Sequence, residues 1–172
     1  AGLDGLGARQ QNFGSTAESL RNDFLILRLH LVSLQSFGDD WTLRNDAWAQ
    51  HSPHRLPSIR QFKVGGGRIG RGFDAAAVSG ERGLASKFEL RRRLADDVPI
   101  ADRIDAYAFY DIGATWREDT AGRESAASSG LGLSIRSRRV SGYFELARPL
   151  THADADGNKE LGLFVELTSR FD

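Results

Sequence analysis

The chain has 172 residues, and its 23 basic and 23 acidic side chains cancel, so the net charge predicts no nucleic-acid partner. It contains no cysteine, which excludes disulfides and thiolate metal sites. No run of about 18 apolar residues predicts a spanning helix, but a transmembrane β-barrel has only alternating apolar residues and can be hydrophilic on average.

Apolar and polar residues alternate over most of the chain, which is typical of strands with two unlike faces. In chain order we expect strands at roughly Gly2–Phe13, Asp23–Ser36, Asp40–Ser52, Ser58–Val64, Leu84–Leu94, Ile104–Arg117, Ala127–Arg136, Val140–Leu146 and Leu161–Phe171. A tight turn at 137–139 contrasts with longer polar or glycine-rich loops at 65–80, 118–125 and 151–158. The pattern predicts an all-β chain of about nine antiparallel strands joined as a meander, without a helix.

Two architectures fit such strands. In Ile104–Arg117 one face carries Tyr110 and Ile112, whereas the other carries Phe109 and Asp111. A soluble barrel or sandwich, the commoner architecture, turns the apolar face inward, whereas a membrane barrel turns it toward lipid. Three features favour the membrane barrel. The strands are about 10 residues long, the polar face mixes both charge signs with bulky aromatics, and the apolar face has aromatics near its ends.

The segment Val64–Phe73 contains a literal G-x-G-x-x-G formed by Gly65, Gly67 and Gly70. A dinucleotide-binding interpretation requires a strand before these glycines and an amphipathic helix after them. More glycine-broken loop follows instead, and then a strand-like alternation. The glycines therefore belong to a long loop inside an all-β protein.

Other apparent sites lack a complete ligand pattern. His51 and His54 have metal-like spacing, but Pro53 breaks any helix and no third ligand is apparent. Residues 154–158 resemble part of a calcium loop, but the first and last ligand positions of such a loop would be His152 and Leu163, which do not match the calcium-ligand pattern. A hairpin turn explains the segment better. No serine lies in a Gly-x-Ser-x-Gly motif. We therefore expect no enzyme, no cofactor and no metal.

Four motifs carry a resemblance to a known family. They are Gln61–Gly66 at a strand end entering a long loop, Arg71-Gly72-Phe73 at the tip of that loop, Phe109–Gly113 on a later strand, and the terminal strand Leu163–Phe171. With these motifs the chain resembles the C-terminal barrel half of the two-partner secretion transporters. These are the haemolysin secretion/activation proteins related to the filamentous-haemagglutinin transporter, in the superfamily that includes the outer-membrane protein assembly insertases.

The resemblance implies a fold and a location. Residues 1–172 would form the C-terminal portion of an outer-membrane barrel domain in a Gram-negative bacterium, with the loop 65–80 folding into the lumen. They would supply the last eight or nine strands of an up-and-down, sixteen-stranded transmembrane barrel. The missing N-terminal strands and periplasmic domains would lie elsewhere in the protein, and the absence of methionine also favours a processed chain or a fragment. Gly70, where the family usually has an apolar residue, and Asp172 after Phe171 depart from the family pattern.

The implied function is translocation of a large secreted exoprotein of the haemolysin or adhesin type through the barrel. Its partners would be that exoprotein, outer-membrane lipid and, during biogenesis, the barrel assembly machinery, which would read the terminal Phe171. Two alternatives stay open, an assembly insertase of the same superfamily and a soluble β-barrel binding module. Solubility without detergent would favour the soluble module, because a lipid-facing leucine stripe should otherwise aggregate.

The resemblance also implies site residues. The loop residues Arg71, Gly72 and Phe73 would fold back into the barrel, where Arg71 would pair with Asp111 of the strand motif that also includes Phe109 and Gly113. Alternation independently places Asp111 on the polar face; the alternative is that Arg71 is a solvated loop arginine and Asp111 an ordinary pore-lining carboxylate. Further charges on that face would line a hydrated lumen or pair across strands; they are Arg28, Lys87, Glu89, Arg91, Arg93, Glu145, Glu166 and Arg170.

Overall fold

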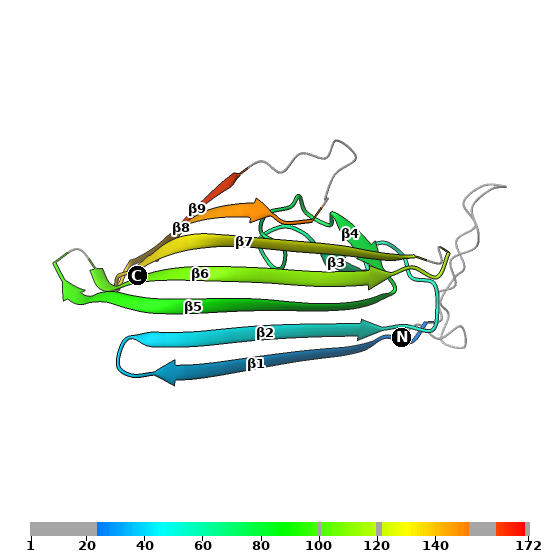
Figure 1. Cartoon of the computed structure of the whole chain (residues 1–172), viewed down its shortest axis with the longest axis horizontal. Helices are drawn as coiled ribbons and strands as arrows, with labels where there is room; N and C mark the ends of the chain where they lie inside the picture. Colours follow the sequence, from blue (N-terminus) through cyan, green and yellow to red (C-terminus); the bar gives the residue numbers. More distant parts are fainter. Residues whose placement is uncertain (1–23, 100, 120–121, 152–160, 171–172) are drawn as a thin grey trace.

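The computed structural model describes residues 24–99, 101–119, 122–151 and 161–170. The larger of their two sheets consists of β1 (Leu27–Phe37), β2 (Trp41–His51), β5 (Arg82–Val98), β6 (Ala101–Trp116), β7 (Arg123–Arg136), β8 (Val140–Pro149) and β9 (Gly162–Ser169). These seven strands lie in the order β1-β2-β5-β6-β7-β8-β9 (Figure 1), and every neighbouring pair is antiparallel. The predicted all-β, up-and-down fold is confirmed, and the described strands form an open sheet.

A second, two-stranded sheet lies within the connection between β2 and β5. It pairs β3 (Phe62–Val64) with β4 (Val78–Gly80). The predicted strand Ser58–Val64 was too long, because a turn closed by Arg60 N donating to Pro57 O at 2.8 Å delays its start. The segment 65–80, predicted as loop throughout, ends in a strand that forms only where the chain returns beside β3. The meander therefore has seven described strands, and the predicted strand Gly2–Phe13 lies outside the described residues.

The two ends of the large sheet differ in their connections. Short turns join β1 to β2, β5 to β6 and β7 to β8 at one end, on the left of Figure 1. The strand ends that the longer connections join, from β2 to β5, from β6 to β7 and from β8 to β9, lie at the opposite end. We call these the short-turn end and the long-loop end. Outer-membrane barrels have the same asymmetry, with short turns on the periplasmic side and longer loops outside the cell.

The large sheet has an apolar and a polar face, and residues opposed across neighbouring strands share a face. Leucines at one alternation, such as Leu29, Leu131 and Leu163, are exposed on the apolar face. The long connection with β3 and β4 packs instead on the polar face. A soluble barrel or sandwich needs the opposite arrangement, with the leucines covered, so the packing supports the predicted membrane-barrel orientation of the faces.

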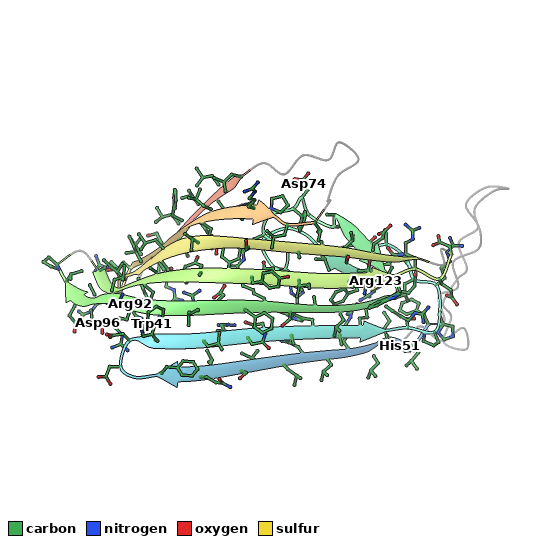
Figure 2. All side chains as sticks on the ribbon, viewed as in Figure 1. Trp41, His51, Asp74, Arg92, Asp96 and Arg123 are labelled. Carbon is green, nitrogen blue, oxygen red and sulfur yellow. The ribbon has the colours of Figure 1, made fainter. Side chains whose placement is uncertain are left out.

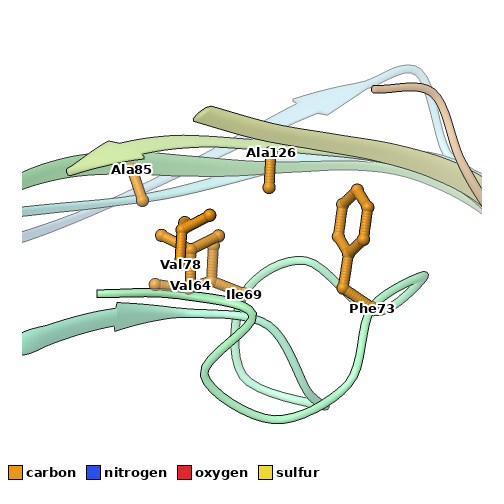
Figure 3. Close-up of a cluster of buried hydrophobic side chains, with 6 residues drawn as sticks. All are labelled: Val64, Ile69, Phe73, Val78, Ala85 and Ala126. Carbon is orange, nitrogen blue, oxygen red and sulfur yellow. The ribbon is translucent and has the colours of Figure 1, made fainter. Parts of the chain in front are cut away.

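A small hydrophobic cluster attaches this connection to the sheet (Figure 3). Val64, Ile69, Phe73 and Val78 come from the connection, whereas Ala85 and Ala126 come from the sheet strands β5 and β7. A further sheet contact explains Gly113, because a Cβ there would lie 2.6 Å from Val64 Cγ2. The cluster fixes the loop 65–77 over the polar face and so positions the site at its tip.

Candidate functional site

Two glycines shape the loop tip. Gly70 has a φ of 82°, a conformation that residues with side chains rarely adopt. Gly72 approaches the sheet so closely that a Cβ would lie 2.8 Å from Pro149 N and 2.9 Å from Ser128 Cβ. The backbone therefore turns at Gly70 and touches the wall at Gly72, which carries the residue between them, Arg71, down onto the polar face.

The structure brings Arg71 and Asp111 together in a bidentate pair. Arg71 Nε donates to Asp111 Oδ2 at 3.0 Å, and Nη2 donates to Oδ1 at 2.9 Å. The backbone N–H groups of Gly70 and Arg71 also donate to Asp111 Oδ2, at 3.0 and 3.2 Å. Only 2% of the Arg71 side chain and none of the Asp111 side chain is exposed. Four hydrogen bonds to one carboxylate thus fix both the loop backbone and its arginine.

Two more carboxylates complete the environment of Arg71. Its Nη1 donates to Glu89 Oε1 on β5 at 2.9 Å and to Glu145 Oε1 on β8 at 2.7 Å. Lys87 and Arg91 balance the excess negative charge through ion pairs with Glu89 at 3.1 and 2.6 Å. Three cations, Arg71, Lys87 and Arg91, therefore lie among three carboxylates, Glu89, Asp111 and Glu145, and we call these six residues the Arg71 cluster.

The charge state of Arg71 follows from these neighbours. Burial alone would lower the pKa of Arg71, but hydrogen bonding with Asp111 and the charges of Asp111, Glu145 and Glu89 raise it above its ordinary value. The guanidinium therefore stays charged at any physiological pH. Removing it would leave three carboxylates facing one another in a poorly hydrated place, which is costly.

Aromatic rings fill the space between the charged groups. The Arg71 guanidinium carbon lies 3.5 Å from the centroid of the Phe109 ring, and Tyr107 Oη donates to Glu145 Oε1 at 2.7 Å. Both rings lie over glycines directly opposite on β7, since Tyr107 pairs with Gly132 and Phe109 pairs with Gly130. The absence of side chains on β7 at these two positions lets Arg71 reach across that strand to Glu145.

A half-open groove continues from the Arg71 cluster along the polar face. It has a volume of about 290 Å³ and extends to Arg136 and Ser141, which flank the β7–β8 turn at the short-turn end. Its lining includes carboxylates, cations and the phenols of Tyr107 and Tyr143. The described residues contain no group of three or more side chains suited to holding a metal. The groove is therefore a surface of mixed charge.

Comparison with known proteins gives the family. Residues 1–135 match the family described as haemolysin secretion/activation protein ShlB/FhaC/HecB. The chain belongs to this family. That membership places it in the outer membrane of a Gram-negative bacterium and outside the enzyme classes. No solved structure gives a significant match.

Two curated relatives of this haemolysin secretion/activation family chain are both named outer membrane transporter CdiB. One is from Escherichia coli O6:K15:H31 (strain 536 / UPEC) and the other is from Escherichia coli. Each is 33% identical over 118 residues, which cover 66% of this chain and 19% of the relative. The chain thus spans about a fifth of the length of these relatives.

In this member of the family, the other charged residues expected on the polar face have partners outside the Arg71 cluster. Arg28 Nε donates to Gln50 Oε1 at 2.7 Å, and Arg93 pairs with Asp96 at 2.9 Å near the β5–β6 turn. Glu166 accepts from Tyr143 Oη at 3.0 Å, whereas Arg170 is exposed and bonds through its backbone N–H to Arg139 O. Only Glu89 and Glu145 contact Arg71 directly among the acidic residues predicted beside Asp111. Phe171 lies outside the described residues.

The sequence analysis did not identify Glu81, whose hydrogen bonds connect the base of the loop to neighbouring segments. Glu81, between β4 and β5, is buried and accepts from Gln61 Nε2 at 2.9 Å and from the backbone N–H of Glu118 at 3.0 Å. Gln50 Nε2 also donates to the backbone oxygen of Glu81 at 3.3 Å. The sequence shows a glutamate directly after Gly80, at the end of β4. Its hydrogen-bond partners could not be predicted, because they are distant in sequence.

Proposed function

We propose that this chain is the translocating part of an outer-membrane transporter that secretes a large exoprotein by two-partner secretion. Its membership in the haemolysin secretion/activation family and its similarity to outer membrane transporters support this proposal. The exoprotein, of the haemolysin or adhesin type, crosses unfolded through the barrel. No cofactor takes part, and folding of the exoprotein outside the cell supplies the drive.

The observation that carries the proposal is the loop anchored by Arg71 on the polar face. In a closed barrel this face lines the lumen, so the loop 65–80 lies in the path of a passing chain. The Arg71–Asp111 pair holds the loop tip in one place, and the motif residues Phe73, Phe109 and Gly113 support its packing. The pair therefore acts as a brace that keeps the conduit in its working shape.

The charges beside the brace suit an unfolded polypeptide. Anchored carboxylates and cations of both signs line the groove, and Lys87, Arg91 and Glu166 are partly accessible from it. A surface of mixed sign binds no single charge type strongly, so a chain of varied sequence can slide along it. Selection of one ion would require a ring of one sign.

Replacing Arg71 in the full-length transporter tests the brace. Arg71→Ala leaves Asp111, Glu89 and Glu145 uncompensated, so we expect secretion of the exoprotein to fall at least about tenfold, since a buried pair that loses one partner costs about 3–5 kcal/mol. Arg68→Ala is the matched control, because Arg68 is an exposed arginine on the same loop, and its guanidinium carbon lies over the Trp48 ring, 5.7 Å from the centroid, outside the Arg71 cluster.

The amount of folded barrel in the outer membrane must be measured in parallel, by its heat-modifiable migration in gels. Normal export by an Arg71→Ala barrel that is correctly inserted would refute the role given to the pair.

Co-purification with the full-length transporter identifies the protein that it acts on. A single secreted exoprotein supports transport, whereas several different barrel proteins would contradict it and indicate an insertase.

A further inference from the structure

The apolar face carries a row of three residues at its long-loop end that the proposed transport does not use. Trp116 on β6 lies directly opposite Arg82 on β5 and directly opposite Arg123 on β7. Opposed residues share a face, so all three point away from the polar face, beside outward residues such as Leu84. Figure 2 labels Arg123 at this end of the sheet.

Both arginines of the row are exposed, and neither has a carboxylate partner within the described part of the chain. Among the described residues, no ion pair or hydrogen bond links the side chain of Arg82 or Arg123 to an acidic group. Glu124, the neighbour of Arg123 in sequence, is opposed to Thr115 and so faces the other way. Two unneutralised cations therefore flank one tryptophan at the rim of a lipid-facing surface.

The position of the row at the end of the strands places it at the level of the lipid headgroups. Aromatic side chains at the ends of barrel strands lie at the level of lipid headgroups. Since outer-membrane barrels have their longer loops outside the cell, we infer that the long-loop end lies at the outer leaflet, whose glycolipid carries phosphates at both ends of a disaccharide. Guanidinium groups bind phosphate through paired, charge-assisted hydrogen bonds.

The spacing of the row fits this glycolipid. Neighbouring strands lie about 4.8 Å apart, so the backbones of Arg82 and Arg123 are separated by roughly 10 Å with Trp116 between them. That arrangement allows one arginine for each phosphate and an indole ring for the sugar face. A phospholipid offers only one phosphate and no sugar plane, and so matches less of the row.

We propose that Arg82, Trp116 and Arg123 form an outward-facing binding site for a phosphorylated disaccharide glycolipid of the outer leaflet. The site is separate from the Arg71 cluster, which lies on the opposite face of the same sheet. It ties β5, β6 and β7 to the membrane surface at the strands that support the loop. Lipid binding here is independent of whether the transporter moves an exoprotein.

The experiment measures binding of lipid A to the full-length transporter in detergent by native mass spectrometry. The wild-type protein should bind lipid A with two phosphates at least about tenfold more tightly than lipid A with its phosphates removed, because hydrogen bonds to charged groups are individually worth about tenfold in affinity. The double variant Arg82→Gln/Arg123→Gln should lose that preference.

Arg92→Gln is the matched control. Arg92 also faces outward, but at the short-turn end, where it stacks on Trp41 with 5.4 Å between the guanidinium carbon and the ring centroid (Figure 2). It should keep the wild-type preference. Unchanged binding in the double variant would overturn the proposal, as would equal binding of phosphorylated and dephosphorylated lipid A by the wild-type protein. Binding of phosphatidylglycerol as tight as that of lipid A would overturn the assignment to a glycolipid.

Discussion

At the residue scale, the Arg71 cluster shows how a loop can be positioned by charge inside a polar surface. Net stabilisation from buried ion pairs is often small, because both groups lose water. The bidentate geometry toward Asp111 nevertheless permits only one placement of the guanidinium. The pair is therefore suited to setting where the loop tip lies, and the hydrophobic contacts of Ile69 and Phe73 supply packing energy beside it.

Gly72 provides a test of this positioning that leaves every charge in place. In Gly72→Ala the new Cβ would meet backbone atoms of Pro149 and Arg148 at 2.8 and 3.0 Å, so the loop tip must move away from β8. We expect faster cleavage of the loop in limited proteolysis of the full-length protein and secretion reduced several-fold. Gly67→Ala is the control, because a Cβ there meets no atom within 4 Å. Equal protease sensitivity of the two variants would contradict the close approach at Gly72.

The sequence predicted part of this site and missed another part for a physical reason. Arg71 and Asp111 could be named because each lies in a short motif. Glu89 and Glu145 were expected on the polar face, but not as partners of Arg71, since their distance depends on the register of β5 and β8. Register is a property of paired strands, and the alternation within one strand leaves it open.

At the element scale, β7 differs from its neighbours β6 and β8 because part of its polar face carries no side chains. Gly130 and Gly132 remove the side chains from its polar face where the rings of Phe109 and Tyr107 cross it. An aromatic ring over a cross-strand glycine shields the exposed backbone and fixes the register of the pair. Two glycines that alternate with leucines in β7 were the signal in the sequence.

Gly132→Val should disrupt this arrangement. The added side chain would occupy the place of the Tyr107 ring, so the phenol would leave Glu145 and one hydrogen bond of 2.7 Å would be lost. We expect the purified full-length protein to lose about 2 kcal/mol of stability from overpacking and the lost bond, seen as a lower midpoint in thermal unfolding.

Gly122→Val serves as the comparison, since a Cβ at Gly122 meets no atom within 4 Å. An equally small shift in both variants would show that Tyr107 does not depend on the glycine beneath it. The strands themselves were predictable from alternation, except that β3 occupies only the end of the predicted strand Ser58–Val64 and that β4 was predicted as loop. These two are too short for a pattern and exist because the connection folds back on itself.

At the scale of the whole molecule, the sheet places its exposed leucine surface opposite the anchored loop. This distribution follows from alternation and was predictable. Closure of the barrel was not, because β1 and β9 are the edges of the described sheet and their outer partners are not among the described residues. Unpaired edges are not tolerated in lipid, so we expect both strands to gain a partner, from another part of the protein or from a second copy, when the sheet is in the membrane.

A charge on the apolar face should interfere with insertion. Val165→Arg on β9 places an arginine on the lipid side, at a cost of up to about 2–4 kcal/mol near the middle of the bilayer. Thr168→Arg lies on the polar side of the same strand, where it lines the groove, and should be tolerated. We expect less heat-modifiable, folded barrel for Val165→Arg alone. Equal loss in both variants would argue against the assignment of the faces.

The three anchors of Arg71 have a mechanical consequence. Its carboxylate partners lie on β5, β6 and β8, on both sides of β7. A force applied to the loop tip is therefore shared by three strands, and sliding of β6 past β8 must first break the guanidinium contacts. We therefore expect the part of the sheet from β5 to β8 to move as one rigid unit. If the protein conducts a polypeptide as proposed, we expect any change in the width of the conduit to occur at the strands outside this unit, on the sides of β2 and β9.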